Sequence, residues 1–165
     1  MTDDTAFDGF AAALARAPDA DAAFALLEQR SAAMAGHILF TCLRFDRKDG
    51  VMSRLYSNRE DVSPTGGSKP IPHSAWADRL LRDGNAYIGY DKADLKDVFF
   101  DHEQLWAIGC ESVMNVPVLW QGVVVGSYNI LGGPGQYSEE TARAFAPYAQ
   151  LAVPLLLQPK DLEAA

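Results

Sequence analysis

The chain has 165 residues, of which 48% are hydrophobic and 22% are charged, and its formal net charge is -8. A chain of this length can bury its own core as one domain without disulfides or metal ions. The negative charge argues against non-specific nucleic-acid binding, which depends on clustered Lys and Arg. The two cysteines, Cys42 and Cys110, lack the spacing of a disulfide framework or a zinc site, so we expect no metal centre.

The N-terminus and the uncharged stretches argue against targeting and membrane segments. The first residues, MTDDTAFDG, are acidic, unlike the basic start of a signal peptide. The longest uncharged run, residues 112–138, is interrupted by Asn, Pro, Gln and Gly, unlike a transmembrane helix. We therefore expect a cytoplasmic protein with no membrane partner.

Two helices are predicted at the start of the chain. Residues 8–17 carry Phe10 and Leu14 at helical spacing. A second helix is expected to begin at Asp21, as its N-cap, and to end at Gly36. Residues 1–19 are interpreted as an N-terminal helical extension of the main domain.

Strands and a long loop follow. Residues 37–45 and 51–57 are rich in β-prone residues and predict a hairpin. Residues 58–72 contain two glycines and three prolines, which indicates a loop. Helical spacing returns in residues 73–83, residues 86–90 predict a third strand, and Asp94 and Asp101 could each cap a short helix before residue 108.

The most apolar stretch, residues 109–131, predicts two long strands joined at Gln121-Gly122. Strands this apolar are expected to be covered on both faces, so the polar residues inside them need partners: Ser112, Asn115, Ser127 and Asn129. A two-residue turn pairs Asn115 with Tyr128, which places Asn115 and Asn129 on opposite faces unless a β-bulge shifts the register.

A terminal helix completes the predicted order. Ser138 has the character of an N-cap, and Pro147 and Pro154 predict a kink or an end within the helix. Residues 158–165 are expected to form a disordered tail.

This order of elements resembles that of the GAF domain, in particular a free-standing bacterial GAF protein. The resemblance covers residues 20–157 and is carried by GGSKP (66–70), by FFDHEQLWAIGCESVMNVPV (99–118), and by Gly122, Gly126 and Asn129 in GVVVGSYNIL. It implies an α+β fold similar to that of PAS domains. In this fold a central antiparallel sheet has the N- and C-terminal helices on one face, and loops and short helices close a pocket on the other. It also implies binding of a small molecule.

Nine residues are candidates for ligand contact. The run Gly66-Gly67-Ser68-Lys69 offers backbone N–H groups and one cation to an anionic ligand, although a solvated glycine turn is an equal alternative. Aromatic residues could line the pocket or belong to the core, and buried polar groups in the long strands could face it. The candidates are Lys69, Trp76, Tyr90, Phe99, Asp101, His102, Cys110, Ser112 and Asn129.

An enzymatic alternative uses Cys110 as a nucleophile, with His102 as its base and Asp101 nearby. Free-methionine-(R)-sulfoxide reductases are lone GAF domains that work through several cysteines, whereas this chain has only Cys42 and Cys110. The simpler interpretations are a buried apolar cysteine and a capped helix start. The sequence HEQLW has no second histidine, so it is not an HExxH zinc motif.

The favoured hypothesis is a non-catalytic sensor or regulatory module that binds a small molecule and needs no cofactor. It is expected to signal through a homodimer, formed by the first and last helices, or through a separate partner. A GAF relic that serves only as an oligomerisation module is a third hypothesis.

Overall fold

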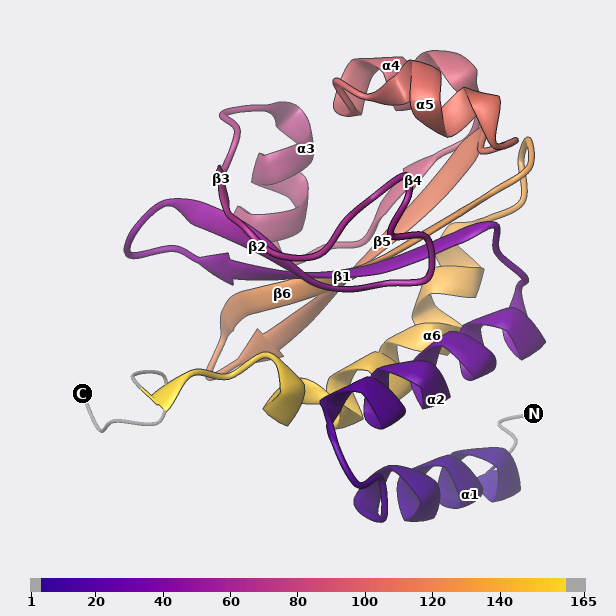
Figure 1. Ribbon diagram of the computed structural model, residues 1–165, viewed down its shortest axis with the longest axis vertical. Helices are drawn as coiled ribbons and strands as arrows, with labels where there is room; N and C mark the ends of the chain where they lie inside the picture. The colour runs from indigo at the N-terminus through magenta and orange to yellow at the C-terminus, as the bar shows by residue number, and fades with distance from the viewer. Residues whose placement is uncertain (1–3, 160–165) are drawn as a thin grey trace.

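The computed structural model describes residues 4–159, in which a six-stranded antiparallel sheet lies between two layers of helices (Figure 1). The strands run in the spatial order β3-β2-β1-β6-β5-β4. Their bounds are β1 Leu39–Asp46, β2 Val51–Ser57, β3 Lys69–Pro70, β4 Tyr87–Gly89, β5 Ser112–Trp120 and β6 Val123–Gly132. The predicted strands are confirmed, and β3 adds a short edge strand within the predicted loop.

The helices divide between the two faces as predicted (Figure 1). On one face lie α1 (Asp4–Ala15), α2 (Ala20–Met34) and α6 (Glu139–Leu151), which the short 3-10 helix η2 (Val153–Leu155) follows. On the other face lie α3 (Ala75–Ala77), the π-helix η1 (Asp78–Arg82), α4 (Lys92–Val98) and α5 (His102–Ala107). This arrangement confirms the α+β fold class.

Two helix starts differ from the prediction. The N-cap of α2 is Asp19, whose carboxylate accepts a hydrogen bond from the backbone N–H of Ala22 at 2.8 Å, and Asp21 lies in the first turn. The N-cap of α4 is Asp91, because its carboxylate accepts a hydrogen bond from the backbone N–H of Asp94 at 3.0 Å. The side chain of Asp94 accepts a hydrogen bond from the backbone N–H of Tyr90.

The terminal helix begins at its predicted cap but passes through its first proline. Ser138 accepts a hydrogen bond from the backbone N–H of Thr141. The helix does not end at Pro147, because α6 continues to Leu151; a kink there stays a prediction. Pro147 is exposed, so the carbonyl that loses its helical partner lies on the solvent side of α6. The helix ends before Pro154, as predicted.

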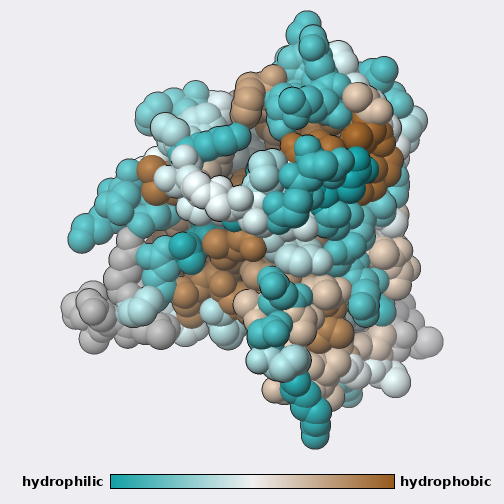
Figure 2. All heavy atoms as spheres, in the orientation of Figure 1, coloured by the Kyte–Doolittle hydropathy of each residue, from teal (hydrophilic) through white to brown (hydrophobic). Residues whose placement is uncertain are grey.

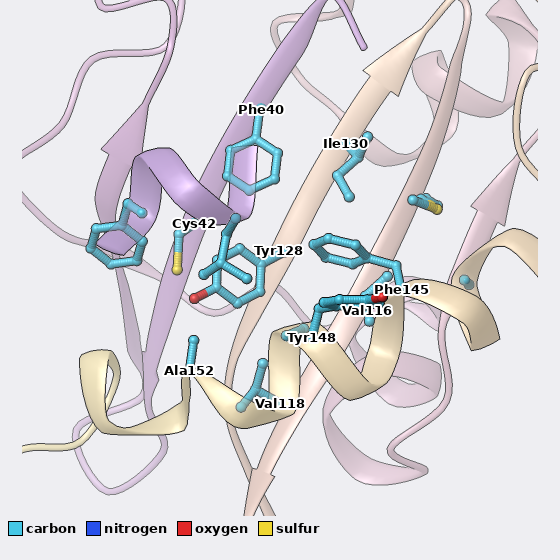
Figure 3. Close-up of a cluster of buried hydrophobic side chains, with 14 of the residues drawn as sticks. Phe40, Cys42, Val116, Val118, Tyr128, Ile130, Phe145, Tyr148 and Ala152 are labelled. Atoms are coloured by element: carbon cyan, nitrogen blue, oxygen red, sulfur yellow. The ribbon is translucent and has the colours of Figure 1, made fainter. Parts of the chain in front are cut away.

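One face of the sheet is filled by the main core. Figure 3 shows side chains of β1, β5 and β6 meeting those of α6, with Tyr128 near the centre. Its ring centroid lies 5.8 Å from that of Phe40 and 6.2 Å from that of Phe145. Burial of such side chains contributes about 1.5–3 kcal/mol each. Phe7 and Phe10 attach α1 to this core through edge contacts with Tyr148.

The register of the central hairpin differs from the prediction because it contains a β-bulge. The turn is confirmed, with positive φ at Gln121 (52°) and Gly122 (80°). Leu119 pairs with Val124 but Val118 pairs with Gly126, so one residue of β6 is extra. The predicted pairing of Asn115 with Tyr128 is therefore wrong, and Asn115 lies opposite Asn129. Both asparagines face the side of the sheet away from the main core.

Three further expectations concern the N-terminal domain boundary, the C-terminal tail and the absence of membrane-spanning helices. The boundary at residue 19 stays a prediction, and residues 160–165 of the expected tail lie outside the described residues. Within residues 4–159, none of the helices combines the length and the apolarity needed to span a bilayer.

Candidate ligand-binding site

A cavity of about 530 Å³ lies on the face of the sheet opposite the main core. Its floor consists of residues of β1 and β6, and β2 lies at one side. Residues 63–72, Trp76 of α3, Leu105 of α5 and the segment that joins α4 to α5 form the remaining walls. Figure 2 shows that hydrophilic residues cover much of the surface in the view of Figure 1, with apolar side chains exposed in patches.

A row of polar side chains crosses the sheet, and two of its members, Thr41 and Asn129, line the floor of the cavity. Thr41, Asn129 and Asn115 lie opposite one another on β1, β6 and β5. Asn129 Nδ2 donates to Thr41 Oγ1 at 3.2 Å, and Asn115 Nδ2 donates to Asn129 Oδ1 at 2.6 Å. The hydroxyl of Ser127 also donates to Asn129 Oδ1, at 3.0 Å. Trp76 Nε1 donates to Asn115 Oδ1 at 3.1 Å, which fixes the indole ring against the cavity.

Apolar clusters flank the polar row on both sides, because side chains two positions along each strand return to the same face. One cluster includes Leu39, Leu105 and Leu131, and the other includes Trp76 with Leu43 packed against it. All five residues also line the cavity. The cavity is thus largely apolar with a hydrogen-bonding strip along its floor.

Three charged residues line the same cavity: Arg54, Lys69 and Asp101. Arg54 projects from β2, and its Nη1 donates to the carbonyl of Pro64 at 3.1 Å. Burial lowers the pKa of the Arg54 guanidinium, whereas the charges of Asp101 and Glu60 act to raise it. Lys69 is exposed, and its Nζ lies 4.4 Å from the centroid of the Phe100 ring. The interior cation is therefore Arg54, and Lys69 lies at the mouth.

The structure brings five of the nine predicted residues to the cavity: Lys69, Trp76, Phe99, Asp101 and Asn129. Their contact with a ligand stays a prediction. The other four, Tyr90, His102, Cys110 and Ser112, do not line it. Tyr90 is 50% exposed beyond β4. Ser112 is buried and fixes the turn after β6, since its hydroxyl donates to the carbonyl of Gly133 and accepts from the backbone N–H of Gln136.

The environment of Cys110 disfavours a thiolate. Its side chain is buried in the cluster that contains Leu105 and Val113, and burial raises the pKa of the thiol to about 11. His102 Nδ1 lies 2.8 Å from the carbonyl oxygen of Phe99, so this nitrogen is committed to the backbone. Among the residues that the structure describes, no group of three or more His, Cys, Asp or Glu side chains is placed to hold a metal ion.

Sequence reasoning missed several residues that line the cavity, notably Thr41, Arg54 and Ser63. Two signals could have found them. The alternation in residues 39–43 places Thr41 on the same strand face as Leu39 and Leu43. Arg54 is the single charged residue in the sequence of β2, VMSRLYS. Ser63 lies in an irregular loop and has no comparable signal.

The comparisons with known proteins address the fold. No protein-family model matches the sequence, and no curated protein matches it. Solved structures do match. The GAF domain of an Acinetobacter phosphoenolpyruvate-protein phosphotransferase has a TM-score of 0.68 and 12% identity, over 94% of this chain and 94% of that chain. The GAF domain/HD domain protein of Geobacter sulfurreducens has a TM-score of 0.67 and 13% identity, over 87% and 95%.

A third match is the GAF domain of a two-component sensor histidine kinase from Bacillus halodurans, with a TM-score of 0.62 and 11% identity over 79% of this chain and 88% of that chain. These similarities, together with the strand order and the two helical layers, show that the chain has the GAF-domain fold.

Proposed function

We propose that this chain with the GAF-domain fold is a non-catalytic sensor or regulatory module that binds a small organic molecule in the cavity above β1 and β6. The observation that carries the proposal is the cavity itself, an apolar space of about 530 Å³ with a row of hydrogen-bonding groups on its floor. This composition is typical of small-molecule sites, where apolar walls supply affinity and a few polar groups fix orientation.

The polar row supports the proposal because Asn115 and Asn129 are bonded within the protein, whereas Thr41, which lines the cavity, keeps a hydrogen that it can donate. Asn115 is fully buried, with its oxygen bonded to Trp76 and its nitrogen to Asn129. Thr41 Oγ1 accepts a hydrogen bond from Asn129, so the hydroxyl hydrogen of Thr41 remains available at the cavity surface. A bound molecule could accept this hydrogen bond without disturbing the rest of the row.

The proteins that contain similar domains support a role in sensing. One structural neighbour belongs to a sensor histidine kinase, another is a methyl-accepting chemotaxis protein, and a third is the chromophore-binding domain of a bacteriophytochrome. The environment of Cys110 supports a non-catalytic module, because a nucleophilic cysteine needs a stabilised thiolate. The two unpaired cysteines support a reducing, cytoplasmic location.

We further propose that the signal leaves through a homodimer or a separate partner that contacts the layer of α1, α2 and α6. Phe7 and Leu14 of α1 are only partly buried, and Leu151 at the end of α6 is 38% exposed. Size-exclusion chromatography with light scattering at micromolar concentration tests the dimer. A strict monomer would exclude the dimer route and leave the separate partner.

Ligand binding is tested by thermal-shift screening against nucleotides, amino acids, organic acids and neutral metabolites. A ligand at about 100 times its dissociation constant adds about 2.7 kcal/mol to the free energy of unfolding, which raises the melting temperature measurably. Thr41→Val should weaken binding of a hit, and Thr5→Val, which makes the same change on the exposed surface of α1, should not. A screen in which no compound raises the melting temperature would count against the proposed function.

A further inference from the structure

Arg54 is a cation inside the cavity that the protein does not neutralise by direct contact. Its Nε is buried and has no hydrogen-bond partner within residues 4–159. Within the described residues, the guanidinium makes a single hydrogen bond, from Nη1 to the carbonyl of Pro64. None of the ion pairs in the described part of the chain includes Arg54. A buried guanidinium donor without an acceptor is costly, and carboxylates are its best partners.

The acids that act on Arg54 through space do not fill this role. Glu60 is occupied at the surface, where its carboxylate accepts hydrogen bonds from the backbone N–H and the hydroxyl of Thr65. Asp101 lines the cavity but makes no ion pair with Arg54 within 4.0 Å among the described residues. The guanidinium is thus free to take an acceptor that comes from outside the chain.

The other uncommitted polar groups of the interior are hydroxyls that can donate. Thr41 already accepts a hydrogen bond from Asn129, which leaves its hydrogen to donate. Ser63 is 3% exposed and lines the cavity, and its hydroxyl has no partner within the part of the chain that the structure describes. Together with Arg54 they form a group of donors that suits an acceptor-rich or anionic ligand group.

The charged residues that line the cavity limit the charge that a ligand can carry. Arg54 is the interior cation, Lys69 is exposed at the mouth against Phe100, and Asp101 contributes a negative charge to the same walls. A dianion such as a phosphate monoester would face one interior cation and a carboxylate, which is unfavourable in a partly desolvated site. A single negative charge matches Arg54.

The remaining walls of the cavity indicate the chemistry of the rest of the ligand. They are aliphatic and aromatic, with Leu39 and Leu131 over one part of the floor and Trp76 and Phe99 around it. Such walls favour an apolar body without further charges. We propose that the ligand is a small organic monoacid whose carboxylate binds Arg54 and whose aliphatic or aromatic body lies between the leucines and Trp76. This inference rests on the proposed function, because it assumes that the cavity binds a ligand.

The test compares carboxylic acids with their primary amides, which have nearly the same shape but no charge. The probes are octanoate, phenylacetate, hydrocinnamate and indoleacetate, each with its amide, added to the general library and measured by thermal shift and calorimetry. The acid should bind about 10- to 100-fold more tightly than its amide, the range expected for a charge-assisted hydrogen bond. Arg54→Gln should reduce this preference to about twofold or less.

Matched variants exclude effects of total charge. Arg143→Gln removes the same charge from the exposed side of α6, on the other face of the sheet, and should keep the full preference for acids. Asp101→Asn should increase the affinity for acids, because it removes a like charge from the wall. Far-ultraviolet circular dichroism checks that each variant is folded, and the comparison of acid with amide in the unmodified protein needs no variant.

The outcomes separate this inference from the function on which it rests. Binding of neutral, cationic or doubly charged molecules in preference to monoacids would overturn the inference and leave the cavity as a ligand site. A preference for acids that persists in Arg54→Gln would overturn the assignment to Arg54. Absence of binding by every compound in the library would overturn the proposed function and the inference together.

Discussion

Asn129 holds together the polar row under the cavity, and its replacement by alanine gives a sharp test of that row. Its side chain takes part in three hydrogen bonds, with Asn115, Ser127 and Thr41. Asn129→Ala removes all three bonds at once. The backbone pairing of β6 with β1 and β5 does not involve the side chain, so the change acts on the row and not on the sheet ladder.

The expected loss of stability depends on which hydrogen-bond partners of Asn129 are buried. Asn115 and Ser127 are both fully buried, and each is left with a donor that has no acceptor. A buried unsatisfied donor costs about 1–3 kcal/mol. The Ser127 hydroxyl can reorient and falls at the low end of this range, whereas the Asn115 amide falls nearer its middle. Thr41 faces the cavity, where water can replace the lost donor. We expect Asn129→Ala to lower the free energy of unfolding by about 3 kcal/mol.

Equilibrium urea unfolding, followed by circular dichroism, measures this change. Thr41→Val is the control, because it removes one bond at the cavity surface and should cost only about 1 kcal/mol. Both variants should keep the urea m-value of the unmodified protein, since the surface exposed on unfolding is unchanged. An Asn129→Ala variant within about 1 kcal/mol of the unmodified protein, or one no less stable than Thr41→Val, would refute the reasoning.

Three further predictions concern the bulge and the cysteines. Gly126→Ala should destabilise the protein by about 1–3 kcal/mol in urea unfolding, because the added Cβ would lie 2.5 Å from the carbonyl oxygen of Leu43 and 2.7 Å from Leu156 Cδ1; an unchanged unfolding midpoint would contradict the close packing. Cys42 and Cys110 should resist iodoacetamide near neutral pH until the protein unfolds, because burial raises the pKa of both thiols; rapid labelling of the native protein would instead favour the enzymatic hypothesis. The pKa of the Cys110 thiol is raised to about 11 in the native state, from an ordinary value of about 9, so between these pH values the unfolded chain releases a proton that the native state keeps, and the free energy of unfolding should fall as the pH rises. Cys110→Ala should remove about 1.4 kcal/mol per pH unit of this slope up to about pH 11, and equal slopes for the two proteins would disprove the prediction.

Most of the fold could be predicted because its signals are local. The apolar run of β5 and β6, the Gln121-Gly122 turn and the cap at Ser138 each need only a few neighbouring residues to be recognised. Asp19 and Asp91 escaped recognition as caps because another aspartate follows each within two or three positions. Choosing between such neighbours depends on where the preceding chain enters the helix, which the sequence does not state.

The site was harder to predict because it depends on contacts between distant segments. The β-bulge that brings Asn115 opposite Asn129 lies at Val125, next to Gly126, which packs closely against Leu43 and Leu156. Leu43 and Leu156 are both distant from Gly126 in sequence, so the local pattern did not reveal the bulge. The prediction from an ideal two-residue hairpin therefore had the wrong register. Conversely, Cys110 and His102 are close in sequence but do not form a catalytic pair. One imidazole nitrogen of His102 is hydrogen-bonded to the backbone carbonyl of Phe99, and the thiol of Cys110 is buried in an apolar cluster.

The same strands form the floor of the cavity and one side of the main core, which bears on how a ligand could be sensed. Thr41 and Asn129 face the cavity, whereas their neighbours Phe40, Cys42 and Tyr128 pack in the core beneath α2 and α6. Figure 3 shows Phe40, Cys42 and Tyr128 beside the side chains of α6. Successive residues of a strand point to opposite faces and share one rigid backbone, so a shift of the floor moves the aromatic core as well. In the proposed sensor, the path from ligand to the outer helices is therefore the thickness of a single sheet.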